Sequence, residues 1–178
     1  MFSKLGLPVY DADTRAKWLM ANGPNIKSQL IELLGPESYN EQGLNRPFIA
    51  RKSFNNEKIL ARLNEIVHPE VGADFTRWVV LHDKSPVLLK ESALIFETSS
   101  HTELDQVILV LSPSVLRIKR VLARDLHRNK KDIEAIISRQ LPASETRLLA
   151  QFIINNDEKG LLLPQVLNIH KTLITQTY

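Results

Sequence analysis

The sequence predicts an α/β protein built on an open, mostly parallel sheet. Three observations support this prediction: short apolar runs alternate with segments of helical periodicity, the segment Gln106–Leu111 ends in five consecutive apolar residues, and residues 22–82 show helical periodicity throughout. Alternating strands and helices are typical of parallel sheets. A continuous apolar run is typical of a strand that is covered on both faces. We therefore expect a parallel sheet with residues 22–82 as a helical insertion.

The composition is that of an ordinary globular protein. Apolar residues make up 43% and charged residues 24% of the 178 positions, enough for one sizeable core and a small appended subdomain. Cysteine is absent, which excludes disulfides and thiolate metal sites and fits a reducing compartment. No apolar run reaches the roughly 18 to 20 residues that cross a bilayer, and no secretory-type segment follows Met1. We expect a soluble, cytoplasmic protein.

The first strand is expected at Leu7–Tyr10, directly after Gly6. Two carboxylates follow it, Asp11 and Asp13, and acidic side chains cap and stabilise the N-termini of helices. The sequence therefore predicts a strand that leads directly into a helix.

Consecutive helices are predicted between residues 22 and 82, because apolar residues recur there at helical spacing. His68 is followed by Pro69, and a residue that precedes proline is driven away from helical geometry. We therefore expect one helix to end at His68 and another to begin at Pro69. The expected helices are Asn25–Leu34, which Gly35-Pro36 ends, Pro47–Phe54, a third that Asn55 caps, and a fourth from Pro69 to about Leu81.

Strands and helices alternate over the second half of the chain. The expected strands are Val87–Lys90, Gln106–Leu111 and Phe152–Ile154. Ser112 is a capping residue followed by Pro113, which suits the first helical position, so a helix is expected to begin there. Later helices are expected at Lys131–Gln140, in a short segment from Ser144, and from Leu161 to about Ile174.

The two carboxylates after the first strand are candidate catalytic groups. Open α/β sheets build their ligand sites at the carboxyl ends of the strands, which is where Asp11 and Asp13 stand. A carboxylate at that place orients a hydroxyl group, or accepts its proton, during phosphoryl transfer. The alternative is a purely structural helix cap, which local sequence alone favours.

A dense basic segment lies between Arg117 and Lys131. It carries seven basic residues against one acid, Asp125, although the whole chain has a formal charge of only +3. One interpretation is a solvated helix face. The other is a clamp for phosphate groups, because guanidinium groups bind phosphate oxygens with two parallel hydrogen bonds. The basic residues are Arg117, Lys119, Arg120, Arg124, Arg128, Lys130 and Lys131.

Six short segments, in one fixed order, resemble those of a single enzyme family. The segments are Pro8-Val9-Tyr10-Asp11-Ala12-Asp13, Asn64-Glu65-Ile66-Val67-His68-Pro69, Glu91-Ser92-Ala93-Leu94-Ile95-Phe96-Glu97, Arg120-Val121-Leu122-Ala123-Arg124-Asp125, Gln140-Leu141-Pro142 and Phe152-Ile153-Ile154-Asn155-Asn156. Together they resemble dephospho-CoA kinase, a family of the P-loop kinase type, along nearly the whole chain.

The resemblance implies an activity and its substrates. The reaction would be transfer of the γ-phosphoryl group of ATP, in the presence of Mg²⁺, to the ribose 3′-hydroxyl of dephospho-CoA, the last step of coenzyme A synthesis. Asp13 is then the expected base or hydroxyl-orienting group, with Asp11 supporting it. Arg124, and with it Arg120 and Arg117, is expected to reach the ATP phosphates.

The resemblance also divides the chain. Residues 1–21 and 83–178 correspond to a nucleotide-kinase core with a lid at about 124–142, and residues 22–82 correspond to a helical subdomain that binds the acceptor. Further residues are expected around the substrates, and each has a structural alternative as a helix-end, core, turn or salt-bridge residue. They are Arg46, His68 and Phe96 at the acceptor wall, Asn155 or Asn156 beside adenine, and Glu91 near the water shell of Mg²⁺.

The sequence departs from the family at its beginning. The family opens with a strand and a Gly-rich loop that ends in Gly-Lys-Ser or Gly-Lys-Thr and holds the β- and γ-phosphates. No such loop occurs in this sequence, and residues 1–6 correspond to the end of the helix that would follow it. We expect a parallel sheet without its first, central strand, and a chain with little or no kinase activity. A misassigned start codon and a natural loss both explain this departure.

Three other functions fit some of the same residues. A non-catalytic protein that binds coenzyme A or dephospho-CoA would keep the acceptor site and lose ATP. Another P-loop nucleotide or metabolite kinase would share the lid and the strand-end carboxylate. Nucleic-acid binding through residues 117–131 is disfavoured, because no aromatic residue lies among these basic residues to stack on bases.

Overall fold

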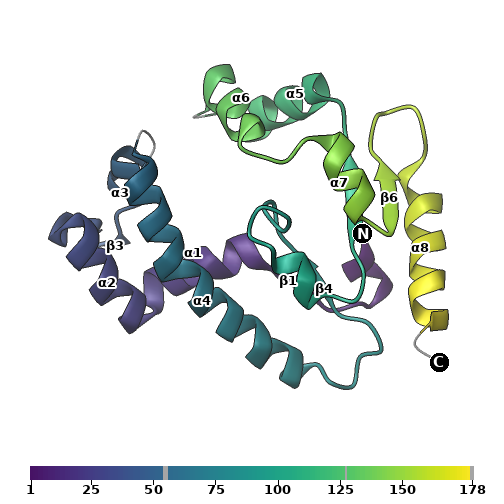
Figure 1. The fold of residues 1–178 in the computed structure, drawn as a ribbon, viewed down its shortest axis with the longest axis horizontal. Coiled ribbons are helices and arrows are strands. Elements are labelled where there is room, and N and C mark those ends of the chain that lie inside the picture. The colour runs from purple at the N-terminus through teal and green to yellow at the C-terminus, as the bar shows by residue number, and fades with distance from the viewer. Residues whose placement is uncertain (54–55, 127, 177–178) are drawn as a thin grey trace. The chain divides into compact units, whose positions relative to one another are not determined.

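The computed structural model of the chain describes residues 1–53, 56–126 and 128–176. The chain divides into two compact units, which are described separately. The helical unit comprises Gly6–Ser92, and the C-terminal unit comprises Ala93–Tyr178 with Met1–Leu5. Figure 1 labels most of the helices and strands, and their types and order confirm the predicted α/β class. In the described ranges, no helix is both long enough and apolar enough to span a membrane.

The helical unit combines one parallel strand pair with four α-helices. Its elements are β1 (Val9–Asp11), α1 (Ala12–Asn22), α2 (Pro24–Leu34), η2 (Pro36–Ser38), β2 (Tyr39–Asn40), β3 (Gly43–Leu44), α3 (Arg46–Ser53), α4 (Glu57–Leu81) and β4 (Leu89–Glu91). Strands β1 and β4 pair in parallel, with Val9 opposite Leu89. The four helices enclose an apolar core that includes Ile26 and Leu30, which are almost fully buried. The small antiparallel ribbon β2–β3 was not among the predicted elements.

Helix α4 runs unbroken through Pro69, so the predicted break at His68 is wrong. Proline removes one helical hydrogen bond and crowds the preceding turn. The helix continues because side chains on both sides of the proline are buried, Ile66 and Val67 before it and Asp74 after it. Burial on both sides outweighs the local preference for a break.

An asparagine begins α4, as predicted, but it is not the predicted one. The side chain of Asn56 caps the helix by accepting the backbone N–H of Ile59 at 3.1 Å. The predicted cap at Asn55 lies outside the described residues, as does Phe54 at the predicted end of the preceding helix. The capping of α4 by an asparagine was therefore predictable, but the cap is Asn56, one residue after the predicted Asn55.

The C-terminal unit contains the second parallel pair. Its elements are η1 (Phe2–Leu5), η3 (Ser100–Glu103), β5 (Ile108–Leu111), α5 (Ser114–Arg124), α6 (Lys130–Ser138), α7 (Ala143–Leu149), β6 (Phe152–Asn155) and α8 (Leu162–Gln176). Strands β5 and β6 are in parallel register from Ile108 opposite Phe152 to Leu111 opposite Asn155. Helix α8 packs on this pair through Val166, which contacts the core around Ile154.

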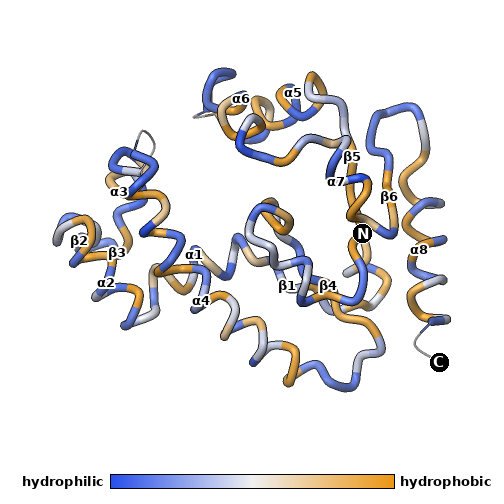
Figure 2. Tube along the Cα trace, in the orientation of Figure 1, coloured by the Kyte–Doolittle hydropathy of each residue, from blue (hydrophilic) through white to orange (hydrophobic). Residues whose placement is uncertain are grey.

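The apolar run of β5 forms a parallel strand, as predicted, but it is not covered on both faces. Figure 2 shows the trace of β5 as mostly hydrophobic. Ile108 packs into the core beneath α8, whereas Val110, two residues further along the same face, is 57% exposed. Within the described residues β6 is the only strand paired with β5. One neighbouring strand is too little to cover the whole run.

The start of α5 differs from the predicted one. The helix begins at Ser114, after Pro113, and no side chain caps it. The hydroxyl of Ser112, the predicted cap, instead accepts a hydrogen bond from Arg120 at 3.1 Å. A long-range guanidinium contact has replaced the local capping bond.

Replacing Pro69 by alanine is expected to stabilise the helical unit. Alanine restores a backbone N–H inside α4, and proline in a helix interior costs about 3 kcal/mol relative to alanine. We expect the free energy of unfolding in urea to rise by about 1 to 3 kcal/mol. Pro47→Ala is the matched control, because Pro47 stands in the first turn of α3, where the N–H has no helical partner. A less stable Pro69→Ala variant would show that α4 accommodates the proline without strain.

Candidate functional site

The two carboxylates at the end of β1 have different environments. Asp11 caps α1: its Oδ1 accepts the backbone N–H of Thr14 at 2.9 Å, and its Oδ2 accepts the Thr14 hydroxyl at 2.7 Å. These hydrogen bonds lower the pKa of Asp11. Asp13 lies exposed in the first turn of α1, and its carboxylate has no hydrogen bond or ion pair with any residue that the structure describes. Asp13 is therefore the carboxylate that is available to a ligand.

Glu91 stands beside Asp11, because the two are opposite each other in the parallel register of β1 and β4. The structure thus brings two of the predicted acidic residues to one end of the strand pair. In the described parts of the chain, no group of three or more His, Asp or Glu side chains is arranged to hold a metal ion. A contact of Glu91 with a magnesium water shell stays a prediction.

A buried ion cluster joins β1 and α1 to α4. Asp74 is 8% exposed and accepts two hydrogen bonds from Arg15, from Nε at 2.8 Å and from Nη2 at 2.7 Å. The Tyr10 hydroxyl also donates to Asp74, at 2.8 Å. The bonds from Arg15 lower the pKa of Asp74, whereas burial and the nearby carboxylate raise the pKa of Tyr10. The cluster therefore holds an ionised carboxylate, a guanidinium and a neutral phenol in one arrangement.

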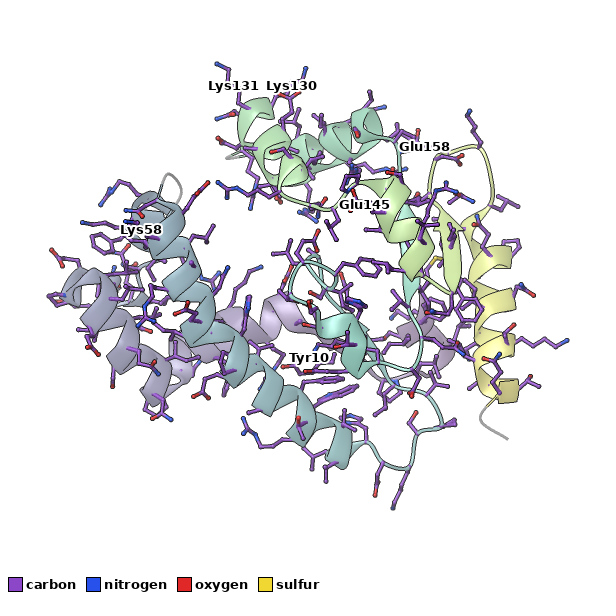
Figure 3. The ribbon with its side chains drawn as sticks, viewed as in Figure 1. Tyr10, Lys58, Lys130, Lys131, Glu145 and Glu158 are labelled. Carbon is purple, nitrogen blue, oxygen red and sulfur yellow. The ribbon has the colours of Figure 1, made fainter. Side chains whose placement is uncertain are left out.

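Aromatic rings complete the surroundings of Tyr10, which lies beside α4 in Figure 3. Phe75 and Trp78 meet the Tyr10 ring edge to face, with centroids 5.0 Å and 5.5 Å away. Lys90, next to Glu91 on β4, places its ammonium 4.4 Å from the centre of the Phe75 ring. Both strands of the pair are thus tied to the same part of α4.

The predicted acceptor-wall residues are divided between the two units. Arg46 at the start of α3 and His68 in the middle of α4 are exposed residues of the helical unit. Phe96 belongs to the C-terminal unit, where it is buried and its ring lies 5.2 Å from that of His101. The burial of Phe96 fits its structural alternative as a core residue.

The three predicted phosphate-binding arginines lie along α5 and differ in how firmly they are held. Arg124 has a 75% exposed side chain and pairs with its neighbour Asp125 at 2.9 Å, which raises the pKa of Arg124. Arg117 donates to Gln140 Oε1 at 3.0 Å, and its Nε is buried without a hydrogen-bond partner in the described structure. Arg120 binds three partners at the ends of β5 and β6. Arg124 is the most accessible of the three.

Two of the sequence segments that carried the resemblance meet in the C-terminal unit. The backbone N–H of Leu141 donates to Glu97 Oε1 at 2.7 Å, and Gln140 Nε2 donates to the carbonyl of Ala93 at 3.4 Å. The end of the predicted lid is therefore anchored to the segment that follows β4.

The carboxyl ends of β5 and β6 open into a cavity of about 270 Å³. Asn155, one of the two predicted adenine-side residues, lines it. Asn156 instead uses its backbone, donating its N–H to Leu111 at 2.7 Å and accepting a bond from Arg120 at 3.1 Å. Sequence reasoning missed Arg147 and the neighbours of the strand ends, although the rule that sites form at strand ends pointed to them. The lining residues are Leu111, Ser112, Pro113, Ala143, Arg147, Asn155 and Asp157.

Comparison with known proteins identifies the family of the chain. The family model of dephospho-CoA kinase matches residues 1–161. A dephospho-CoA kinase of Porphyromonas gingivalis is 34% identical over 97% of this chain and 85% of its own. A dephospho-CoA kinase of Leptospira interrogans is 35% identical over 88% of this chain and 75% of its own. The chain belongs to the dephospho-CoA kinase family.

Solved structures show the same fold. The crystal structure of TT1252 from Thermus thermophilus superimposes with a TM-score of 0.81 at 26% identity, over 98% of this chain and 87% of that one. A dephospho-CoA kinase from Campylobacter jejuni gives 0.70 at 20% identity, over 99% and 89% of the two chains, which supports the fold alone. The predicted P-loop-kinase-like fold and membership of a phosphotransferase family are thus confirmed, and ATP is the phosphate donor that this family implies.

Replacing Asp74 by asparagine is expected to destabilise the helical unit. The variant leaves Arg15 without its charged partner, and removing one partner of a buried polar pair costs about 1 to 3 kcal/mol. Because water screens the partly exposed Arg15 side chain, we expect about 1 to 2 kcal/mol in urea denaturation at neutral pH. Glu65→Gln, which breaks the exposed Arg62–Glu65 pair on the same helix, is the control and is expected to cost less than about 0.5 kcal/mol. Equal losses in both variants would contradict a special role for the buried cluster.

The same cluster is expected to make stability depend on pH in the acid range. The folded-state pKa of Asp74 lies below the unfolded value of about 3.9, so its contribution is complete above that value and is lost as the pH falls through the folded-state pKa. Below about pH 4, the unfolding free energy of the wild type should therefore fall more steeply than that of Asp74→Asn. Parallel curves would mean that Asp74 titrates alike in the folded and unfolded chains.

Proposed function

We propose that this chain carries the acceptor site and the nucleotide-base site of an enzyme that phosphorylates the ribose 3′-hydroxyl of dephospho-CoA with magnesium ATP. The observation that carries the proposal is the contrast at the end of β1: Asp11 is engaged as a helix cap, whereas the exposed Asp13 carboxylate has no partner among the described residues. A free carboxylate at the carboxyl end of a parallel strand suits a group that orients an alcohol or accepts its proton.

In the proposed reaction the 3′-hydroxyl oxygen forms a bond to the γ-phosphorus while the bond between that phosphorus and the β,γ-bridging oxygen breaks. Asp13 accepts the hydroxyl proton and later releases it to water, and ADP leaves. Guanidinium groups stabilise the charge on the phosphoryl oxygens. Arg124, which is exposed, and Arg117, whose buried Nε has no hydrogen-bond partner among the described residues, are proposed for this role.

The cavity at the ends of β5 and β6 is proposed to bind the adenine base of ATP. Its volume of about 270 Å³ is close to the lower end of ligand pockets, so it suits a base better than a whole nucleotide. The Asn155 side chain offers both a donor and an acceptor, as a purine edge requires. Pro113 and Leu111 supply apolar surface for the ring faces.

Residues 22–82 are proposed to bind the acceptor, with Arg46 and His68 as exposed contacts. Arg46 suits the pyrophosphate of dephospho-CoA, because a guanidinium group binds two phosphate oxygens at once. Glu91 is proposed to contact the water shell of the magnesium ion of ATP. The cysteine-free composition supports a cytoplasmic location.

A second candidate function is a non-catalytic protein that binds dephospho-CoA. The observation in its favour is that the sequence contains no Gly-Lys-Ser or Gly-Lys-Thr, the usual means of holding the β- and γ-phosphates in this class of kinases. Calorimetry separates the two functions, because the binder takes up dephospho-CoA without measurable affinity for ATP.

Kinase turnover of the chain is expected to be low. Loss of a single group that stabilises transition-state charge lowers rates by about 10²- to 10³-fold, and the absent loop would supply several such groups. In a coupled ADP-release assay with dephospho-CoA and magnesium ATP, we expect turnover at least about a hundredfold below the ordinary 1 to 100 per second of kinases. Asp13→Asn controls for contaminating kinases, since it should abolish any residual turnover of this chain. Ordinary rates in the wild type would show that other groups hold the phosphates.

Asp13→Asn is also expected to change the preference between dephospho-CoA and CoA. CoA carries a phosphate in place of the 3′-hydroxyl, and a carboxylate near that position repels it. By calorimetry we expect the wild type to prefer dephospho-CoA by about tenfold and the variant to prefer it by about threefold or less. Glu41→Gln, a change of an exposed acid in the turn between β2 and β3, should leave the preference unaltered. An unchanged preference in Asp13→Asn would place Asp13 away from the 3′ position.

A further inference from the structure

Arg120 connects the carboxyl ends of β5 and β6. Its Nη1 donates to the hydroxyl of Ser112 and to the carbonyl of Asn156, both at 3.1 Å. Its Nη2 donates to Glu158 Oε1, also at 3.1 Å. Ser112 directly follows β5, and Asn156 and Glu158 belong to the loop that follows β6. One guanidinium group therefore joins two segments that sequence places far apart.

The partners of Arg120 surround the proposed base cavity. Ser112 lines the cavity itself, and Asn156 stands between two lining residues, Asn155 and Asp157. Glu158 follows directly, and its φ of 67° lies in the left-handed region that residues with a side chain seldom adopt. Such a conformation persists where surrounding contacts hold it, and the ion pair with Arg120 is one such contact. Figure 3 labels Glu158 beside this loop.

The donors of Arg120 are largely used. A guanidinium group has five N–H donors, and three of those of Arg120 are engaged with Ser112, Asn156 and Glu158. These three bonds leave only Nε–H and one Nη2–H, and a phosphate bound there would lie beside the carboxylate of Glu158, which repels it. Arg124, by contrast, is exposed and pairs only with its neighbour in sequence among the contacts seen for it.

We infer that Arg120 is a positioning residue that shapes the base cavity, and not a ligand of the ATP phosphates. The inference rests on the proposed function, in that the cavity binds adenine. The contacts of Arg120 do not depend on any ligand: they hold the loop 156–158 against the end of β5.

The two roles of Arg120 predict different binding losses. Arg120→Lys keeps the positive charge but loses the planar fork that reaches three partners. If Arg120 is a positioning residue, the Arg120→Lys variant should bind adenosine about tenfold more weakly than the wild type and ATP more weakly by the same factor, measured by calorimetry. A phosphate ligand would lose affinity for ATP and keep that for adenosine, and this outcome would overturn the inference.

Glu158→Gln gives a second test, with results of opposite sign. If Arg120 positions the loop, loss of the ion pair weakens adenosine and ATP binding by a similar factor of about two to five. If Arg120 binds phosphate, removal of the competing carboxylate strengthens ATP binding alone. Glu41→Gln makes the same charge change at an exposed acid between β2 and β3 and is the matched control, and Lys171→Ala changes an exposed cation on α8; neither should alter either affinity.

Hydrogen exchange without ligand separates failure of this inference from failure of the proposed function. The backbone amides of residues 156–160 should exchange at least about tenfold faster in Arg120→Lys than in the wild type and in Lys171→Ala. Unchanged exchange would overturn the inference whatever binds in the cavity. If the exchange rises but the wild type binds no adenosine, Arg120 does position the loop, and the proposal that the cavity binds adenine is wrong.

Discussion

The ion cluster of Tyr10, Arg15 and Asp74 determines how the helical unit is assembled around the candidate catalytic carboxylate. Its three members come from β1, α1 and α4, and each one satisfies a group that would be costly to bury alone. Because Tyr10 points into this cluster, its neighbours on the strand point away from it. The cluster therefore fixes the direction from which the chain enters α1, and with it the places of Asp11 and Asp13.

The same structure separates charged groups that hold the fold from charged groups that are free to act. Both carboxylate oxygens of Asp11 accept hydrogen bonds from Thr14, and three of the five N–H donors of Arg120 bind groups that follow β5 and β6. Asp13 and Arg124 carry the same chemical groups on exposed turns of their helices. A carboxylate or guanidinium group must be free of strong internal partners to bind a substrate, since displacing such a partner weakens the binding.

Each parallel strand pair has polar residues at its carboxyl end, where open α/β folds bind ligands. In the helical unit this end carries Asp11 and Glu91, and in the C-terminal unit it opens into the cavity lined by Ser112 and Asn155. In the proposed function, the first of these ends recognises the alcohol and the second recognises the nucleotide base. Strand ends and helix starts thus supply most of the groups on which the proposed function depends.

The sequence by itself determined those features that depend on neighbours a few residues apart. The cap at Asp11, the apolar strand from Ile108 and the end of α2 before Gly35 were predictable because their interactions are local. Only the tertiary structure decided that α4 continues through Pro69, that Val110 is exposed and that Asp74 pairs with Arg15, 59 residues away. It also decided which arginine is engaged and which is exposed. These outcomes depend on burial and on pairing between distant segments. A local pattern of residues cannot predict them, because it contains only one of the interacting segments.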